Sequence, residues 1–376
     1  MSPRLDAVVV GGGPAGLAAA LAARRAGLAV ALVERGRPPL DKACGEGLMP
    51  SAVAALARLG VAPPARSATF TGIRYVCGQR VAEADFAGGA TGRGVRRTLL
   101  HGALAEAATT AGVELHWGRA ATGLTARGIA TDAGEIAARY VVGADGLRSK
   151  VRAWAGLARA SRAPRRFGVV RHLRRAPWTA RVEVTFGARV EAYVTPLAED
   201  EIGVALLWDG DGRGFDELLA TSLPAALGRR LAGAPALGRD RGAGPFRQPT
   251  RALACGRVAL VGDAAGYVDA LTGEGLALAF RQALRLGPAL ADGDLAGYAR
   301  DARRDARLPS ALTRLTLFAA RRPALARRLV GALADDPELF SRLLAALGAD
   351  GSLAGLGLPR ALRFAGHLLA PASGPR

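Results

Sequence analysis

The chain has 376 residues, of which 50% are hydrophobic and 22% are charged. This composition excludes a disordered or collagen-like chain and predicts one large domain or two closely packed ones. The formal net charge is +19, and Lys42 and Lys150 are the only lysines among 51 cationic residues. Such an arginine excess is typical of scattered surface charge or of an anionic partner. Because no zinc-finger spacing or RNA-binding aromatic motif accompanies it, we expect no nucleic-acid binding.

Cysteine usage and hydropathy predict a cytoplasmic protein. Cys44, Cys77 and Cys255 lie far apart and are odd in number, so they predict neither a disulfide framework nor a metal site. Asp6 and the glycines that begin at Gly11 interrupt the apolar start of the chain, so we expect no signal peptide. We also expect no transmembrane segment, because no uncharged apolar run approaches ~18 residues.

The chain begins with the pattern of a βαβ unit. Residues 5–10 form a short run of strand-forming residues, residues 14–26 have the composition of a helix, and residues 28–33 predict a second buried strand that ends in Glu34. Parallel strands joined by a helix in this way typically open an α/β domain that binds a dinucleotide.

The turn between the first strand and the helix carries a G-x-G-x-x-G motif. Gly11 suits a tight turn, Gly13 lets the backbone approach a pyrophosphate, and Gly16 lets the helix pack close to the strand. Glu34 lies where a carboxylate binds ribose hydroxyls. The residues that we predict to hold a nucleotide cofactor here are Gly11, Gly13, Pro14, Ala15, Gly16, Glu34 and Arg35.

The middle of the chain predicts a different kind of sheet. Residues 68–85 resemble strands, residues 97–111 resemble a helix, and residues 167–207 alternate as antiparallel strands with one face toward a ligand. A buried strand at 258–261 and a helix at 274–290 then return to the opening style. We therefore predict an α/β domain formed by residues 1–70, 96–155 and 246–300, a sheet domain formed by residues 71–95 and 156–245, and a C-terminal helical segment, 301–376.

Two further glycine–aspartate motifs follow predicted strands. One is the run Gly143-Ala144-Asp145-Gly146, and the other is Gly262-Asp263-Ala264-Ala265-Gly266, which continues to Thr272-Gly273-Glu274-Gly275-Leu276. An aspartate after a strand forms a turn about as often as it binds a ligand. Taken singly these motifs are weak, but three motifs in this order and spacing are specific.

In these motifs the chain resembles the FAD-dependent oxidoreductases of the p-hydroxybenzoate hydroxylase fold, over about residues 1–300. The resemblance implies an α/β fold (α+β overall) with a Rossmann-like FAD-binding domain, an inserted antiparallel substrate sheet and C-terminal helices. It also implies that the first motif binds the ADP half of FAD. The further FAD contacts that it implies are Asp145, Gly262, Asp263, Gly273, Gly275 and Leu276.

The segment from Lys42 to Leu48 narrows the resemblance to the geranylgeranyl-reductase-like branch, which carries a Cys-Gly turn beside the flavin. By that resemblance Cys44, Gly45 and Gly47 touch FAD. Whether Cys44 has a redox role or is a small buried residue stays open.

The predicted helix that opens at Arg97 matches the family's arginine-then-leucine pattern, with Leu100 and Leu104. The match implies that Arg97 pairs with the FAD phosphates or ribityl chain, since a guanidinium suits phosphate geometry. Arg96 is a competing assignment. Ala121 matches a backbone contact to adenine.

Several departures separate the chain from known branches. Gly266 stands where aromatic hydroxylases often carry His, and the halogenases' Trp-rich signature and catalytic lysine are missing. The aromatic substrate motif of geranylgeranyl reductases is reduced to the run Tyr193-Val194-Thr195-Pro196, and Ala270 replaces their usual proline. Tyr193 and Pro196 are therefore the substrate-side candidates, and reduction of a polyprenyl chain is disfavoured.

The leading functional hypothesis is an NAD(P)H-dependent FAD monooxygenase that acts on a small or carrier-bound organic substrate in secondary metabolism. No nucleophile or paired-carboxylate constellation identifies a catalytic residue, although Glu46 and Asp269 are acidic candidates near the flavin. One alternative is a reductase or dehydrogenase of carbon–carbon double bonds. Another is a non-catalytic FAD-binding protein.

The C-terminal region combines arginines with leucines and alanines. This pattern predicts either a solvated helix face or a docking surface for an acidic carrier protein or an anionic membrane. The arginines concerned are Arg303, Arg304, Arg307, Arg314, Arg321 and Arg322.

Overall fold

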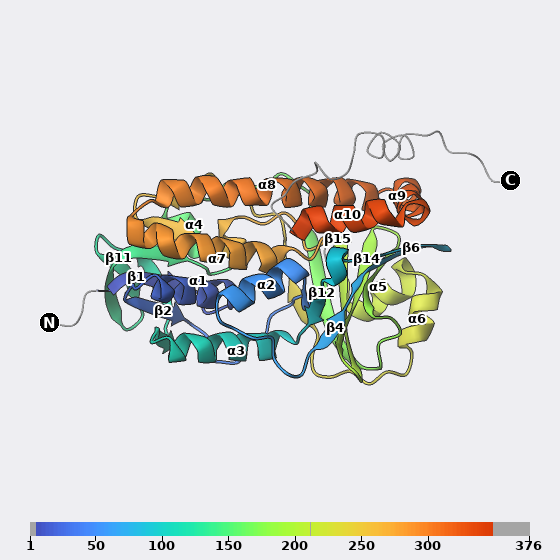
Figure 1. Cartoon of the computed structure of the whole chain (residues 1–376), viewed down its shortest axis with the longest axis horizontal. Coiled ribbons are helices and arrows are strands. Elements are labelled where there is room, and N and C mark those ends of the chain that lie inside the picture. The colour runs from blue at the N-terminus through green and yellow to red at the C-terminus, as the bar shows by residue number, and fades with distance from the viewer. Residues whose placement is uncertain (1–4, 211, 349–376) are drawn as a thin grey trace.

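The computed structural model describes residues 5–210 and 212–348. Figure 1 shows a parallel sheet in one half of the molecule and a largely antiparallel sheet in the other. The helices α8 (Leu295–Ala320), α9 (Pro323–Asp335) and α10 (Pro337–Gly348) extend across both halves. No helix in the described ranges is long and apolar enough to cross a bilayer.

The parallel sheet contains the predicted βαβ unit. Its strands in spatial order are β17 (Ala254–Cys255), β18 (Val258–Leu260), β11 (Gly134–Gly143), β1 (Leu5–Val10), β2 (Val30–Glu34) and β8 (Glu114–Trp117). Neighbours from β18 to β8 are parallel, and β17 is antiparallel. The long strand β11 also pairs with β10 (Gly128–Thr131), which pairs with β9 (Ala121–Leu124). The predicted α/β class is confirmed.

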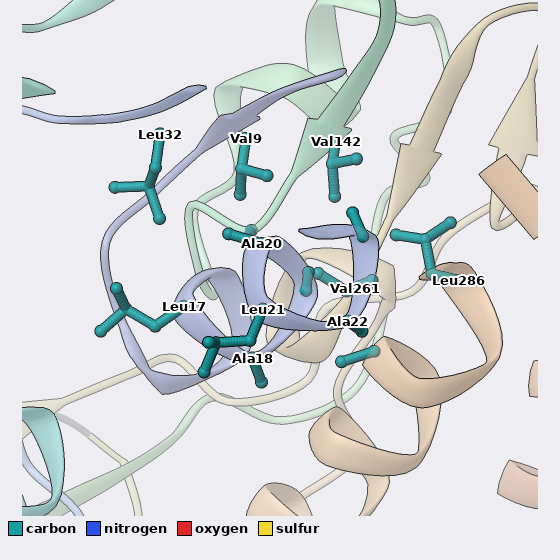
Figure 2. Close-up of a cluster of buried hydrophobic side chains, with 14 of the residues drawn as sticks. Val9, Leu17, Ala18, Ala20, Leu21, Ala22, Leu32, Val142, Val261 and Leu286 are labelled. Atoms are coloured by element: carbon teal, nitrogen blue, oxygen red, sulfur yellow. The ribbon is translucent and has the colours of Figure 1, made fainter. Parts of the chain in front are cut away.

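Small residues let helix α1 (Pro14–Arg25) sit deep in the core. Figure 2 shows its alanines and leucines between Val9 and Val142 of the sheet and Leu286 of α7 (Gly275–Asp292). A Cβ atom at Gly287 would lie 2.4 Å from the Ala22 carbonyl oxygen, so the backbones of the two helices approach each other closely. Helices α2 (Pro50–Arg58) and α3 (Arg97–Thr110) pack around this core. Close packing of this kind fixes the position of the α1 N-terminus.

The second sheet forms the other half of the molecule, and the expected antiparallel run over 167–207 is confirmed. Its strands in order are β16 (Arg241–Ala243), β12 (Arg166–Arg174), β15 (Glu201–Asp209), β14 (Val190–Ala198), β13 (Arg181–Phe186), β5 (Gly72–Cys77) and β6 (Arg80–Asp85). Only β13 and β5 pair in parallel. One face packs on α5 (Phe215–Ser222) and α6 (Ala225–Leu231).

A small sheet lies near the junction of the two halves. It consists of β3 (Gly47–Leu48), β7 (Gly92–Gly94) and β4 (Ala68–Phe70). The predicted domain boundaries stay predictions, and part of the predicted C-terminal segment, residues 349–376, lies outside the described residues.

Candidate cofactor site

The three glycine motifs meet at the N-terminus of α1. Gly11 has a φ of +111°, and a Cβ atom there would lie 2.4 Å from the Ala144 carbonyl oxygen in the second motif. A Cβ atom at Gly262 in the third motif would lie 2.6 Å from the Ala15 side chain. Contacts this close, with backbone at Gly11 and with a side chain at Gly262, leave no room for a Cβ atom, so the fold itself brings the motifs together.

The N-terminus of α1 is open for an anion. Its N-cap residue is Gly13, which has no side chain to accept a bond from the first helical N–H groups, and Pro14 follows at the start of the helix. A Cβ atom at Gly13 would have only the Arg97 guanidinium within 4 Å, at 3.5 Å. The Arg97 Nε is buried and has no hydrogen-bond partner among the described residues. Free N–H groups and a buried guanidinium together suit a pyrophosphate.

Glu34 closes the other side of this turn. Its Oε2 accepts a hydrogen bond from the Gly12 N–H and its Oε1 one from the Gly36 N–H, both at 2.8 Å. Each oxygen keeps a lone pair, so the carboxylate can still accept a ribose hydroxyl. Ala121 begins β9 close by, since the Arg119 N–H donates to the Glu34 carbonyl oxygen at 3.0 Å. Arg35 is exposed at the end of β2.

The structure separates the two arginines that compete for the cofactor. Arg96 forms an ion pair with Glu201 of the second sheet at 3.1 Å, whereas Arg97 lies beside Gly13. One helical turn after Arg97, the fully buried His101 donates from Nε2 to the Gly12 carbonyl oxygen at 3.0 Å. Burial lowers the pKa of His101, so its ring is neutral. His101 was not among the residues predicted from the sequence, although its spacing of four residues from Arg97 was a usable signal.

The cysteine turn lies between the two halves of the molecule. The Cys44 Sγ accepts a hydrogen bond from the Glu46 N–H at 3.4 Å, and the Gly45 carbonyl oxygen accepts one from Thr195 Oγ1 of β14 at 2.9 Å. Gly47 begins β3 within reach of the same threonine. Burial raises the pKa of the Cys44 thiol, against the opposing charge of Arg97, so the thiol stays protonated near neutral pH.

Glu46 connects this turn to both α3 and the second sheet. It is buried and has an unusual φ of 57°. Its Oε1 accepts the Arg97 N–H at 2.7 Å, and its Oε2 is bonded to the Nε2 of the buried His172 in β12 at 2.6 Å. His172 could not be predicted from the sequence, because no local pattern relates residues 126 positions apart.

We expect Glu46→Ala to destabilise the protein by about 2–4 kcal/mol, because it leaves the Arg97 N–H and the His172 ring nitrogen buried without a partner. Glu46→Gln keeps an acceptor for Arg97 and a donor for a tautomer-switched His172, so it should cost less than about 1.5 kcal/mol. Urea unfolding of both variants measures the difference. Equal losses would contradict the assigned bonds.

The carboxylate of Asp145 holds its own turn. Its Oδ2 accepts the N–H groups of Lys150 and Val151 at 2.7 and 3.1 Å, and its Oδ1 is bonded to the Ser149 hydroxyl, which caps α4 (Lys150–Trp154). The buried Arg152 then donates to the carbonyl oxygens of Asp263 and Ala264. The second motif therefore supports the third, and a contact between Asp145 and FAD stays a prediction.

The third motif forms the turn η2 (Gly262–Ala265). Gln282 of α7 anchors it by accepting the Gly262 N–H at 2.7 Å. Burial raises the pKa of Asp263, while the charges of Arg97, Lys42 and Arg152 oppose that rise. Cations from three segments thus surround the first and third motifs, which favours a polyanionic cofactor at this place.

The loop that precedes α7 is held from two sides. Tyr193 of β14 donates its hydroxyl hydrogen to the Leu271 carbonyl oxygen at 2.6 Å, and the hydroxyls of Thr272 and Thr313 in α8 are 2.9 Å apart. Gly273 in this loop has a φ of +69°. The loop ends at Gly275, where α7 starts, and the Leu276 side chain packs on the main core.

The two substrate-side candidates have structural contacts. The Tyr193 hydroxyl is bonded to Leu271, and the buried Pro196 packs so closely on β7 that a Cβ atom at Gly94 would lie 1.6 Å from its carbonyl oxygen. The two residues therefore lie where the second sheet meets the cofactor half. A role in substrate contact stays a prediction for both.

A buried charge cluster lies beside this loop and contains Asp269. Arg166 of β12 forms ion pairs with Glu191, with Asp269 at 2.8 Å and with Asp209 at 3.7 Å, and all four side chains are at most 3% exposed. Arg321 at the end of α8 donates to both oxygens of Asp209 at 2.9 and 2.8 Å. Asp269 is therefore engaged in the link between the two halves.

The buried Glu274 makes the stability of the protein depend on pH. Its side chain is 3% exposed, its oxygens have no hydrogen-bond partner among the described residues, and the Arg281 guanidinium lies 3.8 Å away. Burial raises the pKa of Glu274 to about 7, opposed by Arg281. The native state therefore binds more protons than the unfolded state above the ordinary carboxyl pKa, and stability falls as pH rises to about 7.

We expect Glu274→Gln to remove this fall of stability with rising pH. Relative to the variant, the wild type should lose about 3 kcal/mol of unfolding free energy between pH 4 and pH 8. Urea unfolding of both proteins at several pH values measures it, and a difference that does not change with pH would contradict the assignment.

Known proteins resemble this chain in family and in fold. The chain matches the family model described as "FAD binding domain" over residues 4–307. Over 62 residues it is 60% identical to the menaquinone reductase of Mycolicibacterium smegmatis, which covers 16% of this chain and 15% of that protein. Over 166 residues it is 32% identical to the rifampicin monooxygenase of Streptomyces venezuelae, which covers 41% of this chain and 34% of that protein.

A solved structure supports the fold as a whole. The flavin-dependent brominase Bmp2 superimposes with a TM-score of 0.81 at 17% identity and covers 96% of this chain and 98% of that one. The matched stretches span well under half the length of the two curated relatives named above, so these relatives do not by themselves assign a substrate. With its family model matched over residues 4–307, the chain belongs to the FAD binding domain family, and the predicted p-hydroxybenzoate hydroxylase fold is confirmed.

Proposed function

We propose that the chain is an NAD(P)H-dependent FAD monooxygenase that acts on a small or carrier-bound substrate with oxygen-bearing polar groups. The observation that carries the proposal is the polar character of the second sheet where it meets the cofactor turns. Four side chains make these contacts: Arg166 to Asp269, His172 to Glu46, Tyr193 to Leu271, and Thr195 to Gly45.

Polar groups at this junction favour a polar substrate. A polyprenyl chain has no hydrogen-bonding groups, and burying polar side chains against it costs free energy. A phenol, amide or carrier-linked acyl group can accept or donate hydrogen bonds here. The weak match of the Tyr193–Pro196 segment to the motif of polyprenyl reductases supports the same choice.

In this proposal the chain's own residues bind and orient the FAD cofactor and shield it from water. The α1 N-terminus and Arg97 would hold the pyrophosphate, Glu34 the ribose, and the N-terminus of α7 would face the ring system. When bound, FAD supplies the redox chemistry, with pyridine nucleotide and dioxygen as co-substrates. Burial holds the pKa of the Tyr267 hydroxyl well above its usual range, so it stays protonated beside the third motif.

A second candidate, reduction of a carbon–carbon double bond, is favoured by one observation. Such a reaction needs a proton donor near the cofactor, and the protonated Cys44 thiol lies in the turn with Gly45 and Gly47. The relative from Mycolicibacterium smegmatis, menaquinone reductase, is by its name also a reductase.

Product analysis with isotopically labelled dioxygen separates the two. The FAD-loaded protein is mixed with NADH or NADPH and a panel of phenols, carrier-linked acyl groups and prenylated quinones, in air and without oxygen. A monooxygenase consumes oxygen and places one labelled atom in the product. A product that gains two hydrogens under anaerobic conditions would overturn the proposal and establish the reductase. If NADH and NADPH do not reduce the bound FAD and only a separate flavin reductase does, the proposed NAD(P)H dependence is wrong, while the monooxygenase assignment stands.

A further inference from the structure

We propose that one face of α8 docks this enzyme on an anionic lipid bilayer. The docking strip is defined by Arg304, Arg307, Arg314, Leu315, Phe318 and Arg322. All six residues are exposed. Successive members lie 3, 7, 1, 3 and 4 positions apart. At 3.6 residues per turn, all six fall within about 100° of the helix circumference and share one side. The strip is about 27 Å long at 1.5 Å per residue.

The apolar part of the strip distinguishes it from ordinary solvated arginines. Leu315 is 49% exposed and Phe318 is 51% exposed, the two most exposed large hydrophobic side chains of the described residues. They lie three positions apart on the helix and are flanked by arginines on both sides. The Arg322 guanidinium stacks over the Phe318 ring at 3.7 Å from its centroid. A charge placed beside an aromatic ring suits the boundary between lipid headgroups and acyl chains.

The acidic residues of α8 form their ion pairs with arginines outside the strip. Asp305 pairs with Arg285 of α7 at 2.5 Å, and Asp301 lies 3.9 Å from the same guanidinium. Arg321 is likewise turned inward, toward Asp209, so the expectation that it joins a docking surface is wrong. The strip therefore carries positive charge that these carboxylates do not neutralise.

The shape of the strip favours a membrane over an acidic protein. Figure 1 shows α8 as a long helix along one edge of the molecule. A flat anionic surface can contact the whole side of such a helix at once, and it can take up Phe318 and Leu315 while phosphates meet the arginines.

The strip also lies on the helix that contacts the cofactor loop. Thr313, one residue before Arg314, is bonded to Thr272, and the Arg321–Asp209 pair continues to Arg166 and Asp269. Docking would therefore place the loop before α7 close to the bilayer. The inference holds for either oxygenation or reduction, so it does not rest on the proposed function.

Co-sedimentation of the FAD-loaded full chain with vesicles tests the proposal. We expect binding to phosphatidylglycerol-containing vesicles, weakened by salt, and little binding to pure phosphatidylcholine. Arg314→Gln with Arg322→Gln should weaken binding about 25-fold, at about fivefold per arginine. Leu315→Ser with Phe318→Ser should also weaken it, and most clearly at high salt, where the apolar contribution remains.

The control variants remove two arginines and one apolar side chain at exposed positions outside the strip. Arg159 and Arg162 are exposed on the loop after α4, and Leu99 is 37% exposed on α3. Arg159→Gln with Arg162→Gln, and Leu99→Ser, should leave vesicle binding within about twofold of the wild type. Absent binding of the wild type at low salt, or equal losses in the controls, overturns the proposal. Wild-type vesicle binding by the Leu315→Ser, Phe318→Ser variant also overturns it and favours an acidic macromolecule.

Discussion

Gly13→Ala is expected to weaken FAD binding by about 30-fold, or about 2 kcal/mol, without unfolding the protein. In the free protein the new methyl group meets only the Arg97 guanidinium, at 3.5 Å, and that flexible end can move. With FAD bound, the methyl group stands where the pyrophosphate must approach the backbone. Titration of FAD into the apoprotein measures the dissociation constant, and thermal unfolding of both apoproteins measures the fold.

Gly102→Ala is the matched control. Gly102 is exposed within α3, and a Cβ atom there has nothing within 4 Å, so the substitution should leave FAD affinity unchanged and stabilise the helix by up to about 1 kcal/mol. An unchanged dissociation constant in Gly13→Ala would contradict the assignment of the α1 N-terminus to the pyrophosphate. If both variants lost the same FAD affinity, the effect would not come from the glycine turn.

Arg166→Met is expected to destabilise the protein by about 3–5 kcal/mol, the largest stability effect that we predict. Among the described residues it removes the one cation paired with both Glu191 and Asp269, and it leaves these carboxyl groups buried near Asp209. Burial already raises the pKa of Glu191 and of Asp269. The variant can therefore recover part of the loss by binding protons, and the deficit should shrink from pH 8 to pH 5.

Arg241→Gln is the control for this variant. Arg241 and Asp41 form an ion pair of similar length, 2.8 Å, but both side chains are about one-third exposed. Loss of this ion pair should lower the free energy of unfolding by less than about 1 kcal/mol, and this difference should vary little with pH. Urea unfolding at the two pH values compares the proteins. An Arg166→Met variant no less stable than Arg241→Gln would show that the buried cluster does not hold the two halves together.

Much of the cofactor half could be predicted from the sequence because its signals are local. Gly11, Gly13 and Gly16 lie within six residues of one another, and Glu34 follows at the end of the next strand. The family resemblance also marks Gly262 as an FAD contact, which stays a prediction. The structure adds the reason that these motifs act together, which is the contact of Gly11 with Ala144 and of Gly262 with Ala15.

The contacts between the two halves could not be predicted in this way. Glu46 and His172 are 126 positions apart, and Arg166 and Asp269 belong to a strand and a loop with no shared pattern. Charge in the sequence does not indicate which arginine turns inward: Arg321 pairs with Asp209, whereas Arg322, its neighbour, is exposed. Such pairs follow from tertiary packing, which a single sequence does not display.

The central claim is that three separate motifs form one FAD site at the N-terminus of α1. A crystal structure of the FAD-loaded protein tests it most directly. The account predicts the pyrophosphate beside the N–H groups that follow Gly13 and near the Arg97 guanidinium, the ribose hydroxyls at Glu34, and the ring system between the Cys44 turn and the start of α7. FAD bound elsewhere, or a pyrophosphate that contacts neither Gly13 nor Arg97, would contradict it.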